Sequence, residues 1–104
     1  MGFTASDGSE LTAIAQNNTA IAAGVATDTV IKANPGHLAR ALVTAVGTAN
    51  LLIYDNVSAG SGVVIGIVKS TAVVGDYVDI QMPANNGITV KGAATNAGVT
   101  IAWT

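Results

Sequence analysis

The chain has 104 residues, enough for one domain but not for two, and a formal net charge of −2. Its four basic residues are scattered, and charged residues make up only 10% of the sequence, so the basic patch that nucleic-acid binding needs is missing. No apolar run approaches the roughly 18 residues of a membrane span, and without cysteine there is no disulfide or thiolate chemistry.

The apolar half of the composition favours strands over helices. Val and Ile together number 22 against 5 Leu, and there are twelve Gly and twelve Thr. Branched side chains suit a pleated sheet, where their restricted rotamers cost little. We therefore expect an all-β fold. A surface this poor in charge is expected to be covered by other protein.

Residues 1–26 differ from the rest of the chain, because their apolar residues are widely spaced among Ala, Ser, Thr and Asn. Leu11, Ile14 and Ile21 follow an imperfect helical spacing, while residues 19–22 equally fit a short strand. Such a segment buries little by itself and would order on a neighbouring surface. We expect an N-terminal arm with these three residues as contacts.

From residue 27 onward, short β-like runs alternate with turn residues, as in one small β domain that extends to residue 104. The run at 37–45 also has a helical spacing, but short connections leave little room for one isolated helix, so a strand is preferred. The expected strands are residues 29–34, 37–45, 48–55, 62–69, 76–82, 87–92 and 99–104.

The last three runs alternate between apolar and polar residues, which indicates one buried and one exposed face of an antiparallel β-sandwich. The runs at 51–54 and 63–68 do not alternate and are apolar on both faces. In a two-layer domain only a second subunit or a partner can cover the outer face. Leu52, Tyr54 and Val64 are therefore candidate interface residues.

The glycines at 60, 62 and 66 resemble a dinucleotide-binding fingerprint, but their spacing is GxGxxxG and they precede a strand rather than a helix. His37 is the only histidine and has no metal-ligand partner at a suitable spacing. Asp55-Asn56 fits a turn that caps its own backbone, with a weak calcium site as the alternative. We expect no enzyme activity and no cofactor.

Arg40 is the single arginine and lies in an apolar run. Arginine is enriched at interfaces, where it pairs with acidic residues across a subunit boundary. The alternative is a solvated strand residue. Arg40 is kept as a candidate interface residue.

Several turn and strand motifs recur in a known class of proteins. They are TVIKA followed by a Pro-Gly and an arginine strand, then IYDN, GVVIG, MPANNGI and the strand of GAATNAGVTI. Over roughly residues 27–104 the chain resembles small virion proteins of tailed bacteriophages. These motifs bear on the fold more than on the function.

The resemblance implies a β-sandwich or jelly-roll-like domain that acts as a homotrimer on the surface of the virion. The expected function is that of a capsid decoration, or cement, protein that binds the major capsid protein and stabilises the head. The alternative is a tail, baseplate or fibre component, including a host-receptor-binding tip. No catalytic residues come with the resemblance.

Overall fold

The computed structural model describes residues 3–4, 10–11 and 17–104, and in this part of the chain it contains strands and no helix. The strands are β1 (Phe3–Thr4), β2 (Glu10–Leu11), β3 (Asn17–Ile21), β4 (Thr29–Lys32), β5 (Gly36–Ala45), β6 (Leu51–Asp55), β7 (Val63–Val68), β8 (Tyr77–Ala84), β9 (Ile88–Val90) and β10 (Gly98–Trp103). The expectation of an all-β fold is confirmed.

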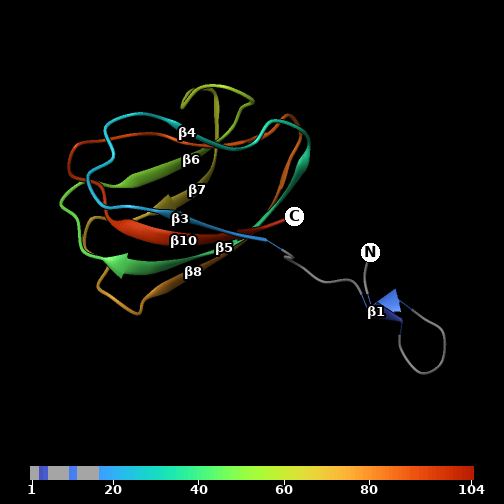
Figure 1. The fold of residues 1–104 in the computed structure, drawn as a ribbon, viewed down its shortest axis with the longest axis horizontal. Coiled ribbons are helices and arrows are strands. Elements are labelled where there is room, and N and C mark those ends of the chain that lie inside the picture. The colour runs from blue at the N-terminus through green and yellow to red at the C-terminus, as the bar shows by residue number, and fades with distance from the viewer. Residues whose placement is uncertain (1–2, 5–9, 12–16) are drawn as a thin grey trace.

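Eight of the strands form two antiparallel four-stranded sheets. The first sheet has the order β3-β10-β5-β8, whose strands lie side by side in Figure 1, and the second has the order β4-β9-β6-β7. From β3 to β10, the first strand pairs with the last, the second with the second last, and so on, which gives the pairs β3–β10, β4–β9, β5–β8 and β6–β7. The segment is thus one long hairpin, rolled so that successive strand pairs enter alternate sheets. β1 and β2 pair only with each other.

Each of the seven strands expected after residue 27 overlaps one of β4 to β10. The run at 37–45 is the long strand β5, so the helical alternative is wrong. Its interior alternates, with Ala41 and Val43 buried and Leu42 and Thr44 exposed. That alternation gives β5 one face for the core and one for solvent.

The expected arm, residues 1–26, includes one strand of the first sheet. β3 pairs with β10 over five residues, from Ile21 opposite Val99 to Asn17 opposite Trp103. The indole Nε1 of Trp103 donates to the Thr19 hydroxyl at 2.9 Å. Residues 17–21 therefore belong to the sheet, whereas nothing further is described of residues 12–16.

One hydrophobic core contains buried residues of both sheets. The first sheet supplies, among others, Leu38, Val99 and Ile101, and the second supplies Ile53 and Ile88, all with no measurable exposure. Burying such side chains contributes about 1.5–3 kcal/mol each before conformational entropy is subtracted. The core thus holds the two sheets together and leaves their outer faces for other contacts.

Candidate interaction surface

The outer face of the second sheet carries several apolar side chains. Tyr54 lies directly opposite Val64, and Leu52 lies opposite Ile67. Directly opposed residues of antiparallel strands point to the same face. Because Leu51 and Ile53 alternate with them and are fully buried, these four side chains point away from the core.

Val30 of β4 points to the same face. Thr89 of β9 lies between β4 and β6, directly opposite both Val30 and Tyr54. The Thr89 side chain is buried, and its hydroxyl donates to the Asn56 carbonyl at 2.7 Å. Val30, Val64 and Ile67 have exposed fractions of 39–47%, and Leu52 and Tyr54 are half-buried. We call this set the outer apolar face. Its members are Val30, Leu52, Tyr54, Val64 and Ile67.

The seven candidate interface residues are distributed unevenly. Leu52, Tyr54 and Val64 gather on the outer apolar face. Ile21 lies in the core, because its pairing with Val99 directs both side chains inward, so it is not accessible to a partner. Leu11 is in β2, of which only the backbone is described, and Ile14 lies outside the described residues.

Arg40, the seventh candidate, points to the outer face of the first sheet. Its guanidinium is 4.0 Å from the Asp79 carboxylate and 5.7 Å from the centre of the Tyr77 ring. Arg40 and Asp79 are about half exposed, so their ion pair contributes little to stability. Arg40 therefore has a partner within its own chain.

A row of polar side chains continues from this ion pair along β8. The Gln81 amide donates to Asp79 at 2.8 Å, and its oxygen accepts from Nε2 of His37 at 2.9 Å. Gln81 has a φ of +54°, the one positive value among non-glycine residues in the described ranges. A side chain held in this left-handed conformation costs on the order of 1 kcal/mol and often marks a functional position.

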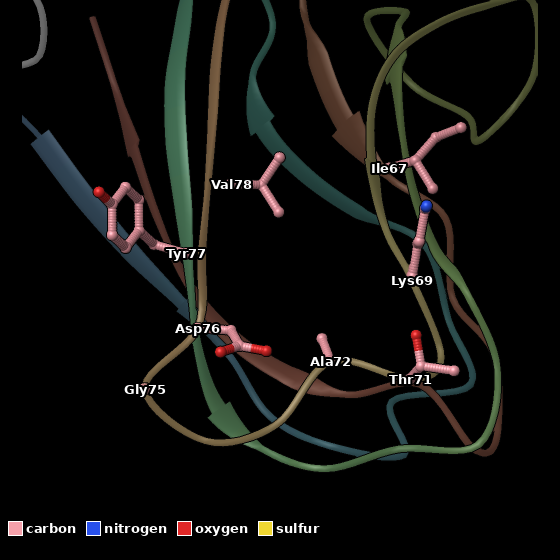
Figure 2. A pocket seen from close by; sticks show the side chains of 8 residues that line it. All are labelled: Ile67, Lys69, Thr71, Ala72, Gly75, Asp76, Tyr77 and Val78. Carbon is pink, nitrogen blue, oxygen red and sulfur yellow. The ribbon is translucent and has the colours of Figure 1, made fainter.

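A cavity of about 460 Å³ opens between the edge strands β7 and β8. In Figure 2 the side chains of Ala72 and Val78 point toward it, while Tyr77 points away, and Ile67 borders it from β7. The polar groups at its rim include Lys69. The lining of the cavity is mixed, with apolar side chains beside the polar groups of Lys69, Thr71 and Asp76, and a hollow of this size can receive a side chain.

Gly66 lets β7 and β8 come together beside this cavity. A Cβ atom there would lie 3.0 Å from Ile80 and 3.1 and 3.2 Å from Leu38 and Ile53. The atoms closest to Gly66 are thus side-chain atoms rather than backbone.

Two carboxylates organise the loops at the ends of the sheets. Asp28 accepts hydrogen bonds from the backbone N–H groups of Gly92 and Gly60, at 2.8 and 2.7 Å. These two bonds lower the pKa of Asp28 from its ordinary value of 3.8, against a smaller opposing effect of burial.

Asp55 is surrounded by three donors, the N–H groups of Asn85, Asn86 and Gly87, at 3.0, 2.7 and 3.2 Å. Burial raises the pKa of Asp55, but the hydrogen bonds together outweigh it, so the pKa lies below 3.8. N–H donors that point at a carboxylate leave little room for a cation. Among the described residues, no three His, Cys, Asp or Glu side chains cluster to hold a metal ion.

The neighbouring Asn56 caps its own turn, as the sequence predicted. Its side-chain oxygen accepts from the N–H groups of Ser58 and Ala59, at 2.9 and 3.0 Å. The glycine-containing loop that follows leads into β7, and Gly62 has a φ of +97°. No helix N-terminus follows these glycines, so the loop lacks the geometry that holds a pyrophosphate.

No protein-family model matches this chain, and neither a curated protein nor a solved structure shows significant similarity to it. In the part of the chain that the structure describes, no helix is long and apolar enough to cross a membrane.

Proposed function

We propose that the protein is a structural component of a bacteriophage virion, a capsid decoration protein that binds the major capsid protein and stabilises the head. It acts as a homotrimer on the head surface and carries out no catalysis. The single observation that carries the proposal is the outer apolar face, where five large apolar side chains from three strands lie exposed or half-buried together.

The strand order supports a β-sandwich of the jelly-roll type. When β3 to β10 are counted from one to eight, the sheets read 1-8-3-6 and 2-7-4-5, the order of a rolled hairpin. Jelly rolls of eight strands are common in viral capsid and lectin domains. Because one fold hosts many functions, this order supports the class of protein, and the surface must support the function.

The free energy of burying the outer apolar face indicates how strongly this face would bind a partner. Completing the burial of five partly exposed side chains contributes roughly 1 kcal/mol each, on the order of 5 kcal/mol in total. Association costs at least about 4 kcal/mol, so the face alone gives weak binding between two isolated copies. A stable attachment then needs several such contacts at once, which a trimer on a repeating shell provides.

The residues before β3 are proposed to supply one of these contacts. Of the strands described there, β1 and β2 pair only with each other and with neither four-stranded sheet. Deletion of residues 1–16 keeps β3 and its pairing with β10. We expect the shortened protein to fold and to bind the shell more weakly.

The test is binding to expanded, undecorated capsids. Wild-type protein is expected to bind with saturation and at a fixed copy number. Val64→Lys, on the outer apolar face and outside the lining of the cavity between β7 and β8, is expected to weaken binding at least about tenfold, since it places a charge in the contact. Val73→Lys is the matched control, because Val73 is exposed in the loop after β7 and lies off that face. Absence of wild-type binding contradicts the proposal.

A tail or fibre component with a receptor-binding tip is the second candidate, and one cluster favours it. Tyr77 is 64% exposed beside the planar polar groups of Arg40, Asp79 and Gln81. An exposed ring next to amide and carboxylate groups is suited to a saccharide. Adsorption to host cells that Tyr77→Ala abolishes, together with no binding to capsids, would favour this candidate.

A further inference from the structure

The two sheets have four free edges, and three of them carry features that discourage pairing with another strand. The edge strand β8 contains Asp79, Pro83 and the left-handed Gln81. β4 has only four residues and ends in Lys32, and β3 begins with two exposed asparagines. Charges, proline, irregular backbone and short length are the usual means of protecting an edge.

The edge strand β7 carries neither charge nor proline, and its one irregularity is a register shift against β6 between Val64 and Gly66. The strand has the sequence VVIGIV, and Val63 is 65% exposed. β6 occupies one side of β7, and the other side has no strand in the second sheet. An exposed apolar edge strand is a template for the addition of a further strand.

The cavity described above lies along this same edge. β7 and β8 approach each other at Gly66 and Ile80, and the cavity opens beyond that point, between Ile67 and Val78. The loop at 69–76 bounds it, and there the Asp76 carboxylate accepts from the N–H of Val73 at 3.0 Å (Figure 2). A strand that paired with β7 would direct alternate side chains inward, toward this hollow.

We propose that the free edge of β7 and the adjacent cavity receive an extended segment of the shell protein, which adds as a fifth strand to the second sheet. This inference rests on the proposed function and names the contact through which it operates. One inward apolar side chain of the added segment, a leucine or an aromatic, fills the space between Ile67, Ala72 and Val78. The segment is uncharged where it follows β7, and Lys69 and Asp76 at the rim favour opposite charges at its ends.

A sheet strand of a second copy does not fit this cavity. The inward residues of β7 itself, such as Ile65 and Val68, are buried in their own core, and the same holds for Val99 and Ile101 of β10. An incoming strand taken from a second folded copy would have to withdraw such side chains from its own core. We therefore take as occupant a segment that is not part of a folded sheet, because such a segment can both pair with β7 and fill the cavity.

The test combines hydrogen exchange with a variant that fills the cavity. In wild-type protein bound to undecorated capsids, backbone amides of β7 are expected to exchange more slowly than in free protein. Ala72→Leu fills the cavity from within, and it is expected to weaken capsid binding about tenfold or more while its melting temperature stays equal or rises. Val74→Leu in the same loop is the matched control, because Val74 is exposed and does not line the cavity.

The outcomes separate this inference from the proposed function. If wild-type protein binds capsids, but Ala72→Leu binds equally well and β7 exchange is unchanged, the inference is overturned and the proposed function stands. If wild-type protein does not bind at all, the proposed function falls as well. Slow β7 exchange without capsids, lost on deletion of residues 1–16, would assign the edge to a second copy and overturn the shell protein as occupant. The exchange measurement on wild-type protein decides the question even if Ala72→Leu fails to fold, because strand addition slows those amides of β7 that point away from β6, whereas cover of the outer apolar face gives them no hydrogen-bond partner.

Discussion

Replacing Asp55 by asparagine tests how the loops at one end of the molecule are held. Its two oxygens accept three backbone N–H bonds from residues 30 to 32 positions further along the chain. Asparagine keeps the size of the side chain but has one acceptor oxygen, and its NH₂ group would face at least one of the donors. Asp55→Asn is therefore expected to leave one or two N–H groups of the loop at 85–87 without a partner.

The expected loss of unfolding free energy follows from the number of hydrogen bonds lost. Hydrogen bonds to a charged acceptor contribute about 1.5–3 kcal/mol each when buried, and the half-exposed position of Asp55 lowers this to about 1 kcal/mol each. Loss of two bonds gives about 2 kcal/mol. For a domain of about 100 residues, this lowers the melting temperature by roughly 8–16 °C.

The assay is thermal unfolding of wild-type and Asp55→Asn protein from pH 7 to pH 2.5. Because the pKa of Asp55 is lowered in the folded protein, its stabilising contribution is complete well above pH 3.8 and is lost as the pH falls through the folded-state pKa. The difference in melting temperature between the two proteins should therefore become smaller below about pH 4. Asp79→Asn, at an exposed carboxylate with a 4.0 Å ion pair, is the control and should change little. An equal difference at pH 7 and pH 2.5, or none at pH 7, would refute the reasoning.

Three further predictions concern the core, a buried amide and the N-terminal boundary. Ile53→Ala should cost about 2–5 kcal/mol of unfolding free energy, whereas Leu52→Ala on the outer face should cost under about 1.5 kcal/mol; similar losses in denaturant titrations would contradict the assigned faces. Asn96→Asp should lower the free energy of unfolding by about 3 kcal/mol or more at pH 7 and by less at pH 3, as measured by chemical denaturation. The reason is that the buried Asn96 amide donates to two backbone carbonyls, which would then face a carboxylate. Deletion of residues 1–16 should leave the tryptophan fluorescence and the melting temperature nearly unchanged. Deletion of residues 1–26 should lower the melting temperature strongly, because it removes β3. Equal melting temperatures of the two shortened proteins would contradict the place of β3 in the sheet.

Local patterns in the sequence predicted most of the strands, because burial on one face of a sheet imposes a period of two. Val99 and Ile101 of β10 alternate with polar or smaller residues and are buried as expected. The two runs without alternation, now β6 and β7, also behave as their composition indicates. Their inner residues are in the core, and their outer residues, such as Leu52, form the outer apolar face.

Features that depend on distant parts of the chain had no local signal. β3 has only Ile21 as a large apolar residue, so its pairing with β10 could not be inferred from spacing. The three bonds to Asp55 come from a loop about 30 residues away. The cavity between β7 and β8 depends on how the two sheets pack. The positive φ of Gln81 could not be predicted, because the residue that sequence patterns associate with a positive φ is glycine.

The central claim is that the outer apolar face is a contact surface that companions cover. Sedimentation equilibrium of the full chain over a dilution series tests it most directly. The account predicts reversible self-association that approaches the mass of three chains at high concentration and is weakened by Val64→Lys but not by Val73→Lys. A chain that stays monomeric at every concentration and also fails to bind undecorated capsids, with no difference between the two variants, would contradict it.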